Sequence, residues 1–123
     1  MPNGKHPGFI ESFGYALSGL KEAILTERNI KVMLGVGLCA VIAGVVLRLD
    51  ALSWAIILFL IGSVLCAELM NTAIEAAVDV ASPTEHPLAK KAKDIAAAAV
   101  IIMSATAAVV GLVVYINAGI KLL

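Results

Sequence analysis

The chain has 123 residues, a formal net charge of zero, and 61% hydrophobic against only 15% charged residues. A soluble domain of this size would have too little polar surface to cover so apolar a composition, so the composition predicts a membrane protein. Balanced charge without a basic patch gives no indication of nucleic-acid binding. The length is that of one domain, which we assign to residues 1–123.

Residues 7–29 have the pattern of an amphipathic helix. Their apolar side chains recur at helical spacing, at Phe9, Phe13, Ala16, Leu17, Leu20 and Ile24. Most of the polar side chains fall elsewhere on the helical wheel. Next to a membrane span, this pattern predicts a helix lying in the membrane interface, and a soluble amphipathic helix is the alternative.

Three uncharged apolar runs follow, at residues 32–47, 51–67 and 95–120. A membrane span needs roughly 20 apolar residues, with about 17 as the lower limit. The third run is long enough by itself, and the first two are long enough if flanking side chains reach the headgroups. We therefore predict spanning helices at 32–49, 51–81 and 88–120. The predicted fold class is all-α, with three transmembrane helices and an N-terminal surface helix.

The links between the runs predict how the helices are arranged. The first link, residues 48–50, is so short that its two helices must be antiparallel neighbours. The second link contains Ser82, Pro83 and Pro87, which interrupt a helix. Pro87 is also well placed to begin the next helix.

Lysine and arginine predict the orientation in the membrane. Seven of them precede the first and third runs, and only Arg48 and Lys121 lie on the other side. Positive charge favours the cytoplasmic side, so the N-terminus and the second link are expected in the cytoplasm.

The second apolar run leads directly into a polar face. In an α-helix, Asn71, Thr72, Glu75 and Asp79 all lie within about 60° of Glu68 around the axis. The residues between them are apolar. Three carboxylates and an amide therefore project from one face of a membrane helix.

Depth separates these side chains. Glu68 lies roughly 26 Å along the helix from Ala51, near the inner edge of a hydrocarbon layer about 30 Å thick. Glu75 and Asp79 then lie in the cytoplasmic headgroup layer. A carboxylate at such depth needs a partner, either a divalent cation with oxygen ligands or a Lys or Arg of a neighbouring helix. A purely structural ion-pair network is the alternative to a functional site.

Other polar groups reach the same cytoplasmic side. Glu27 ends the surface-helix segment and is a candidate metal ligand, although a lone glutamate is usually solvated. Lys93 and Asp94 precede the third run, where lysine can hold phosphate or merely set the topology. Glu85 and His86 lie in the preceding link and are candidates for nucleotide contact. The chain has no phosphate-binding loop of a familiar nucleotide fold.

Several of these segments together resemble a known family. The block from Glu68 to Asp79 resembles the signature of the prokaryotic diacylglycerol kinase and undecaprenol kinase family. The block from His86 to Val100 is similar to that family's second block, and residues 14–20 with 26–29 resemble its N-terminal block. The resemblance covers nearly the whole chain, and residues 26–29 and 86–90 look more like the undecaprenol kinase branch.

The resemblance implies a function and an assembly. It implies a homotrimer in a bacterial cytoplasmic membrane that phosphorylates a lipid alcohol, undecaprenol or diacylglycerol, with ATP and Mg²⁺. Glu68 is then the general base, and Glu27 and Glu75 bind the divalent ion. The implied nucleotide contacts come from Tyr15, Glu27, Glu75, Glu85, His86, Lys93 and Asp94, with Asn71 and Asp79 supporting the site.

The chain departs from the family pattern at one point, and its sequence also fits two other functions. Family members often carry an arginine early in the surface helix, but residues 8–20 contain no Lys or Arg, and Lys5 is the nearest substitute. A carboxylate within a span also fits a small oligomeric ion or proton transporter. A non-catalytic bundle subunit is the third hypothesis.

Overall fold

The computed structural model describes residue 4 and residues 6–123 of the chain; Lys5 lies outside these residues. It contains four helices, α1 (Phe9–Thr26), α2 (Arg28–Val46), α3 (Ala51–Ala81) and α4 (Pro87–Leu122). In this described part there is no strand, and α2, α3 and α4 are long and apolar enough to cross a membrane. The predicted all-α class with three membrane-spanning helices is confirmed, whereas the homotrimer stays a prediction.

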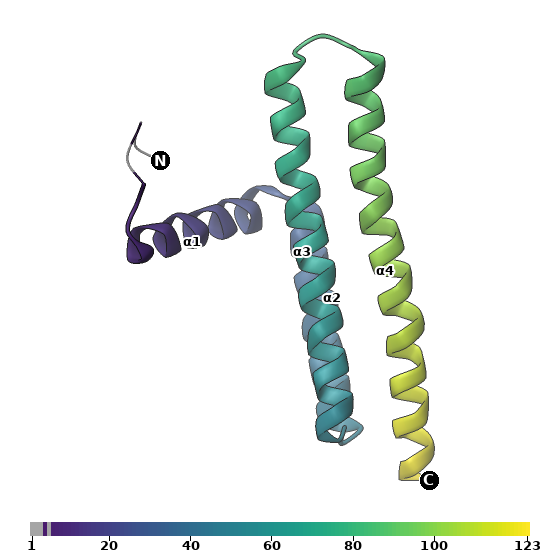
Figure 1. The fold of residues 1–123 in the computed structure, drawn as a ribbon. Coiled ribbons are helices and arrows are strands. Elements are labelled where there is room, and N and C mark those ends of the chain that lie inside the picture. The colour runs from purple at the N-terminus through teal and green to yellow at the C-terminus, as the bar shows by residue number, and fades with distance from the viewer. Residues whose placement is uncertain (1–3, 5) are drawn as a thin grey trace.

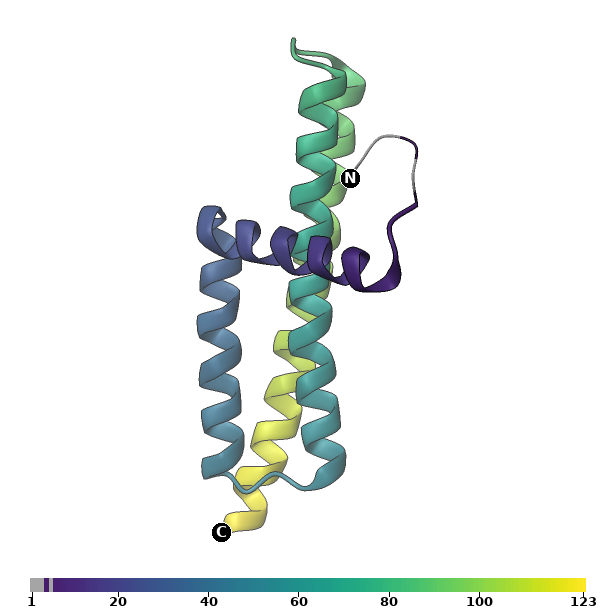
Figure 2. The same cartoon turned by 90° about the vertical axis from the view of Figure 1, so that its left-hand side faces the viewer.

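The three long helices form an antiparallel bundle, and α1 lies across it (Figure 1). The view turned by 90° shows α1 crossing the bundle partway along α3 (Figure 2). The α3–α4 hairpin continues beyond α1, at the end opposite the α2–α3 turn (Figures 1 and 2). Many large side chains of the bundle face outward, including Phe59, which is 72% exposed. Such a surface suits lipid or other subunits.

A single residue separates α1 from α2. Glu27 has an extended backbone, φ −98° and ψ 116°, and its N–H donates to the carbonyl of Ala23 at 2.8 Å. The helix resumes at Arg28, so the charged side chains of Arg28 and Lys31 lie in the first turns of α2, ahead of the uncharged run. Long basic side chains tolerate this position because they extend to the headgroups.

The turn between α2 and α3 is built from local hydrogen bonds. Arg48 has a positive φ of 54°, and Asp50 caps α3 by accepting from the Ser53 N–H at 2.8 Å. This hydrogen bond from the Ser53 backbone lowers the pKa of the Asp50 carboxyl below its usual value. The expected antiparallel pairing of the two helices therefore rests on a well-capped turn.

Close packing joins the helices near this turn. A Cβ added at Gly44 would lie 2.7 Å from the Trp54 ring, so α2 approaches α3 where only glycine fits. The Tyr115 hydroxyl donates to the Ala40 carbonyl at 2.6 Å and links α4 to α2. The buried apolar cluster lies in the same half of the bundle and comprises Leu49, Ile57, Leu60, Val114 and Ala118.

Helix lengths place α1 relative to α3. Along α2, Arg28 lies eighteen residues from Val46 at the α2–α3 turn. Along α3, Leu69 lies eighteen residues from Ala51 at the same turn. Antiparallel helices rise equally per residue, so the α1–α2 bend lies level with Leu69. From there α3 continues to Ala81, a further distance of about 18 Å. If α1 marks the membrane surface, this last part of α3 stands outside the hydrocarbon layer.

Candidate active site

The polar face of α3 lies on one uninterrupted helix. Residues 51–81 are helical throughout, so the angular positions expected from 3.6 residues per turn apply to the whole face. The face follows one stripe that begins level with the α1–α2 bend and runs toward the α3–α4 link. We call it the acidic face and define it by Glu68, Asn71, Thr72, Glu75 and Asp79.

Glu68 and Asn71 are the buried polar residues of the described chain, with exposed fractions of 3% and 7%. Among residues 4 and 6–123, the carboxylates of Glu68 and Glu75 form no ion pair. In this described part, no lysine or arginine of a neighbouring helix pairs with either carboxylate. A buried carboxylate without a cation is a candidate for a functional group.

The middle of the acidic face has unused hydrogen-bonding capacity. The Asn71 side-chain amide donates from Nδ2 to Glu75 Oε1 at 3.1 Å. This bond leaves Asn71 Oδ1 without a partner, and Thr72 Oγ1 is likewise buried and unpartnered within the described chain. Most buried polar atoms in proteins are paired, so these two atoms are exceptions within the described chain.

Lysines of α4 lie at the end of the acidic face next to the α3–α4 link. Lys93 forms an ion pair with Asp79 and so joins α4 to α3. Lys90 pairs with Asp94 one turn further along α4, with 2.5 Å between Nζ and Oδ2. Within the described chain, Asp79 therefore forms an ion pair between helices, whereas Asp94 pairs within α4 and neither Glu68 nor Glu75 forms an ion pair.

A hollow of about 780 Å³ lies under the α3–α4 link. It brings together four of the predicted site residues: Asp79, Glu85, His86 and Lys93. His86 also caps α4, because its Nδ1 accepts from the Leu88 N–H at 3.1 Å. A neutral ring accepting at Nδ1 carries its proton on Nε2, which leaves one donor for another partner.

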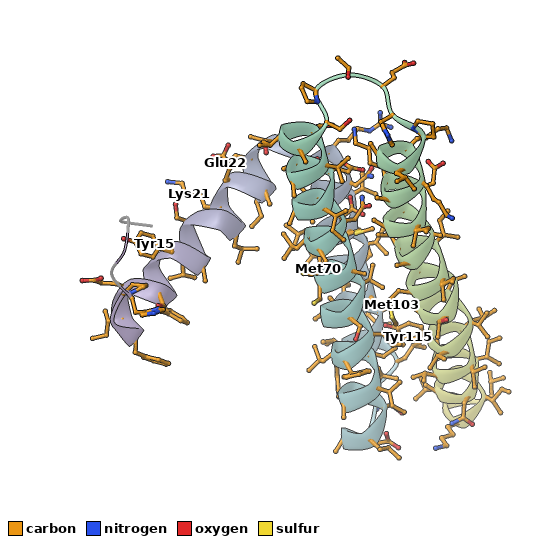
Figure 3. The ribbon with its side chains drawn as sticks, turned by 45° about the horizontal axis from the view of Figure 1, so that its top comes forward. Tyr15, Lys21, Glu22, Met70, Met103 and Tyr115 are labelled. Atoms are coloured by element: carbon orange, nitrogen blue, oxygen red, sulfur yellow. The ribbon has the colours of Figure 1, made fainter. Side chains whose placement is uncertain are left out.

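Two predicted residues lie elsewhere. Tyr15 is on α1, on the part that extends away from α3 and α4, and is not in the lining of the hollow (Figure 3). Glu27 lies at the α1–α2 bend, and its side chain accepts no capping hydrogen bond there. In the part of the chain that the structure describes, no three acidic, histidine or cysteine side chains converge as a metal site. A metal here would need ligands beyond this chain's carboxylates.

Sequence reasoning missed two features. It placed Thr72 on the acidic face but gave it no role, although its place one helical turn after Glu68 was the available signal. It also did not anticipate the bond from Tyr115 to the Ala40 carbonyl, which joins residues far apart in the sequence. No local pattern marks such a contact.

The fold and the acidic face define a small multi-pass helical membrane protein with an oxygen-rich face that begins level with the α1–α2 bend. The family model described as prokaryotic diacylglycerol kinase matches residues 14–115. The chain therefore belongs to the prokaryotic diacylglycerol kinase family, and it is a lipid kinase. This membership favours the kinase hypothesis over a transporter or a non-catalytic subunit.

Individual relatives agree with the family match. The chain is 39% identical over 108 residues to the undecaprenol kinase of Bacillus subtilis, covering 88% of each chain. It is 37% identical to a diacylglycerol kinase of Synechocystis, covering 85% of this chain and 61% of that one. It is 33% identical to the diacylglycerol kinase of Escherichia coli K12, covering 76% of each.

Proposed function

We propose that the protein transfers the γ-phosphoryl group of ATP, with Mg²⁺, to the hydroxyl of a membrane lipid alcohol at the cytoplasmic face of the membrane. The observation that carries this proposal is the position of Glu68. It is 3% exposed, has no cation partner among the residues that the structure describes, and lies one residue from the level of the α1–α2 bend. The hydroxyl of a lipid in the inner leaflet lies at this depth. A carboxylate there can meet a lipid hydroxyl without lifting the lipid out of the bilayer.

Glu68 acts as the general base. As the lipid oxygen attacks the γ-phosphorus, its proton passes to the Glu68 carboxylate. Phosphoryl transfer demands little covalent chemistry from a protein and depends on positioning and charge neutralisation. A single well-placed base together with cationic groups is therefore sufficient machinery.

Glu27 and Glu75 are suited to Mg²⁺. Mg²⁺ typically takes one or two protein carboxylates and completes its shell with phosphate oxygens and water. The Glu27 side chain is not used in capping, and Glu75 keeps one oxygen beyond its bond to Asn71. When bound, the ion would neutralise charge on the ATP phosphates.

The hollow under the α3–α4 link suits the nucleotide. Lys93 can pair with a phosphate group in place of Asp79. Asp94 forms an ion pair with Lys90, which also lines the hollow. Glu85 and His86 supply hydrogen-bonding groups. Tyr15 lies away from this hollow in its own chain, so its nucleotide contact requires the surface helix of another subunit (Figure 3). Active sites shared between the subunits of the proposed homotrimer would allow this contact.

An apolar cavity of about 440 Å³ lies between α2, α3 and α4, and supports a lipid substrate. Its lining includes Val64, one helical turn before Glu68, and reaches Tyr115 in the opposite half of the bundle. A lipid with its hydroxyl at Glu68 would place its hydrocarbon chain here. Undecaprenol is the first substrate to test, because the relative named undecaprenol kinase matches over 88% of both chains.

The test is reconstitution of the purified protein in liposomes with labelled ATP and Mg²⁺. Undecaprenol and diacylglycerol are supplied separately, and labelled phosphate in the lipid fraction is measured. We expect lipid phosphorylation with undecaprenol preferred, and only when ATP is on the side of the N-terminus and the α3–α4 link. Absence of phosphate transfer to any lipid alcohol would refute the proposal.

A further inference from the structure

The three buried glycines of the described helices differ in what surrounds them. A Cβ added at Gly44 would lie 2.7 Å from the Trp54 ring, and one added at Gly37 would lie 3.2 Å from Ile61 Cγ2. Close packing of α2 against α3 therefore explains both of these glycines. Gly111 on α4 is also buried, but nothing lies within 4 Å of a Cβ added there. Glycine is less favourable than alanine inside a helix, and packing within the described chain does not require it at this position.

The space beside Gly111 belongs to the apolar cavity of about 440 Å³ between α2, α3 and α4. On α4 the lining of this cavity runs from Ser104 to Tyr115, about 16 Å of helix, and includes Gly111. A hydrocarbon layer is about 30 Å thick, so the cavity extends over about the depth of one leaflet. A larger side chain at Gly111 would enter this space without meeting another helix of the chain.

One end of the cavity lies close to the acidic face. Val64 and Leu65 line this end, about one helical turn before Glu68 on α3. A lipid whose hydroxyl reaches Glu68 can therefore extend its hydrocarbon chain through the cavity and past Gly111. Lipid tails are as apolar as the cavity wall, so the chain gains little by leaving them and its fit decides whether it enters.

We propose that Gly111 is a specificity-determining residue of the lipid kinase, which keeps the cavity open so that the hydrocarbon chain of the lipid alcohol reaches the middle of the bilayer. This inference rests on the proposed function. A polyprenyl chain and a fatty acyl chain share the required chemistry, and separate substrates distinguish them. Gly111 acts on the fit of the lipid and takes no part in the transfer of the phosphoryl group.

The experiment compares four proteins in the liposome assay: wild type, Gly111→Ala, Gly111→Leu and the matched control Gly119→Leu. Gly119 lies on the same helix, outside the cavity lining, and nothing lies within 4 Å of its added Cβ. With undecaprenol, we expect Gly111→Leu to raise the KM for the lipid about tenfold or more, and Gly111→Ala to raise it less. The kcat and the KM for MgATP should stay close to wild type, and Gly119→Leu should match wild type throughout.

Two further substrates test the position of the chain. Geraniol is a prenol too short to reach Gly111 from Glu68, so its KM should be the same in all four proteins. If geraniol is not phosphorylated, its inhibition constant against undecaprenol is compared instead. Dioleoylglycerol replaces undecaprenol in a parallel series, and the lipid with the larger increase in KM is the one whose chain the cavity holds.

Thermal unfolding and oligomer size are measured on the same samples. A Gly111→Leu protein with wild-type KM for both long lipids overturns the inference, and a higher melting temperature would then identify the cavity as a packing void. A loss of oligomer with unchanged KM overturns it too, since another subunit then occupies the cavity. An equal rise in KM for geraniol and undecaprenol also contradicts it.

If Gly111→Leu does not fold, Gly111→Ala and Gly111→Val make the same comparison. Failure of wild type to phosphorylate any lipid refutes the proposed function itself. An active wild type with an unaffected Gly111→Leu refutes only the role of Gly111.

Discussion

The two ends of the bundle differ in what holds them together. At the α2–α3 turn, helices meet through buried apolar side chains, a glycine at a close approach, and the bond from Tyr115 to the Ala40 carbonyl. At the other end, α3 and α4 meet through the Lys93–Asp79 ion pair around a hollow, and the buried side chains include Glu68 and Asn71. Exposed ion pairs contribute little to stability, so the first end stabilises the fold and the second end is available for chemistry.

This difference predicts that a substitution affects activity at one end of the bundle and stability at the other. Changes at the acidic face should lower activity and leave the folded protein intact. Changes near the α2–α3 turn should lower stability and leave the chemistry intact in whatever protein stays folded. Each experiment below therefore measures both activity and thermal unfolding.

The largest expected effect on activity comes from removing the general base, Glu68. Glu68→Gln keeps the size of the side chain and removes its charge and its basicity, so kcat should fall by about 10²–10⁴-fold. Thermal stability should be unchanged or higher, because a buried charge without a partner is removed. The measurement is lipid phosphorylation with a melting curve on the same protein. Glu22→Gln, at an exposed position of α1, is the control.

An active Glu68→Gln enzyme would contradict the assignment of the base. A variant that is inactive and also unfolded would contradict the separation of the two ends.

Glu75→Gln should act through the metal. Glutamine still accepts the bond from Asn71 Nδ2, which is 3.1 Å long with glutamate, so the local geometry is kept while a negative ligand is lost. We expect the Mg²⁺ concentration needed for half-maximal activity to rise about tenfold or more. The measurement is a Mg²⁺ titration at fixed ATP. An unchanged Mg²⁺ requirement would remove Glu75 from the proposed metal ligands.

The contrast between the ends also explains what could be predicted from the sequence. Hydropathy, proline positions and helical angles are local properties, and they predicted the all-α class, the antiparallel pairing across residues 48–50 and the single stripe of the acidic face. The resemblance predicted Glu68 and Glu75 as site residues, because both belong to a motif that lies within one helix. Their roles stay predictions.

The remaining features depend on contacts between distant residues. The partner of Asp79 is fourteen positions away on α4, and the partner of the Tyr115 hydroxyl is seventy-five positions away on α2. Within the described chain the Thr72 hydroxyl has no hydrogen-bond partner, and this follows from its side-chain conformation, which no spacing encodes. Tyr15 shows the same limit at a larger scale, since its place in a nucleotide site depends on how subunits assemble.

Gly44→Ala tests the packed end. The new methyl group would lie 2.7 Å from the Trp54 ring and 3.0 Å from Leu49 Cδ1, so side chains or helices must shift. Overpacking of this kind costs about 1–3 kcal/mol, and the melting temperature should fall. Gly35→Ala on the same helix is the control, since nothing lies within 4 Å of its added Cβ. A variant as stable as wild type would show that α2 and α3 are not tightly packed here.

The smallest expected effect is that of Tyr115→Phe. The substitution removes only the hydroxyl that donates to the Ala40 carbonyl at 2.6 Å. That carbonyl lies within α2, where a backbone carbonyl also accepts a hydrogen bond of the helix. Side-chain hydrogen bonds between membrane helices contribute about 0.6 kcal/mol on average, because the separated helices find other partners in the membrane. We therefore expect a small decrease in unfolding free energy, measured by denaturation in detergent, and unchanged kcat at temperatures where the protein is folded. A fall in kcat without a change in stability would place Tyr115 in the chemistry, and it would show that the apolar cavity couples the packed end of the bundle to the lipid bound at Glu68.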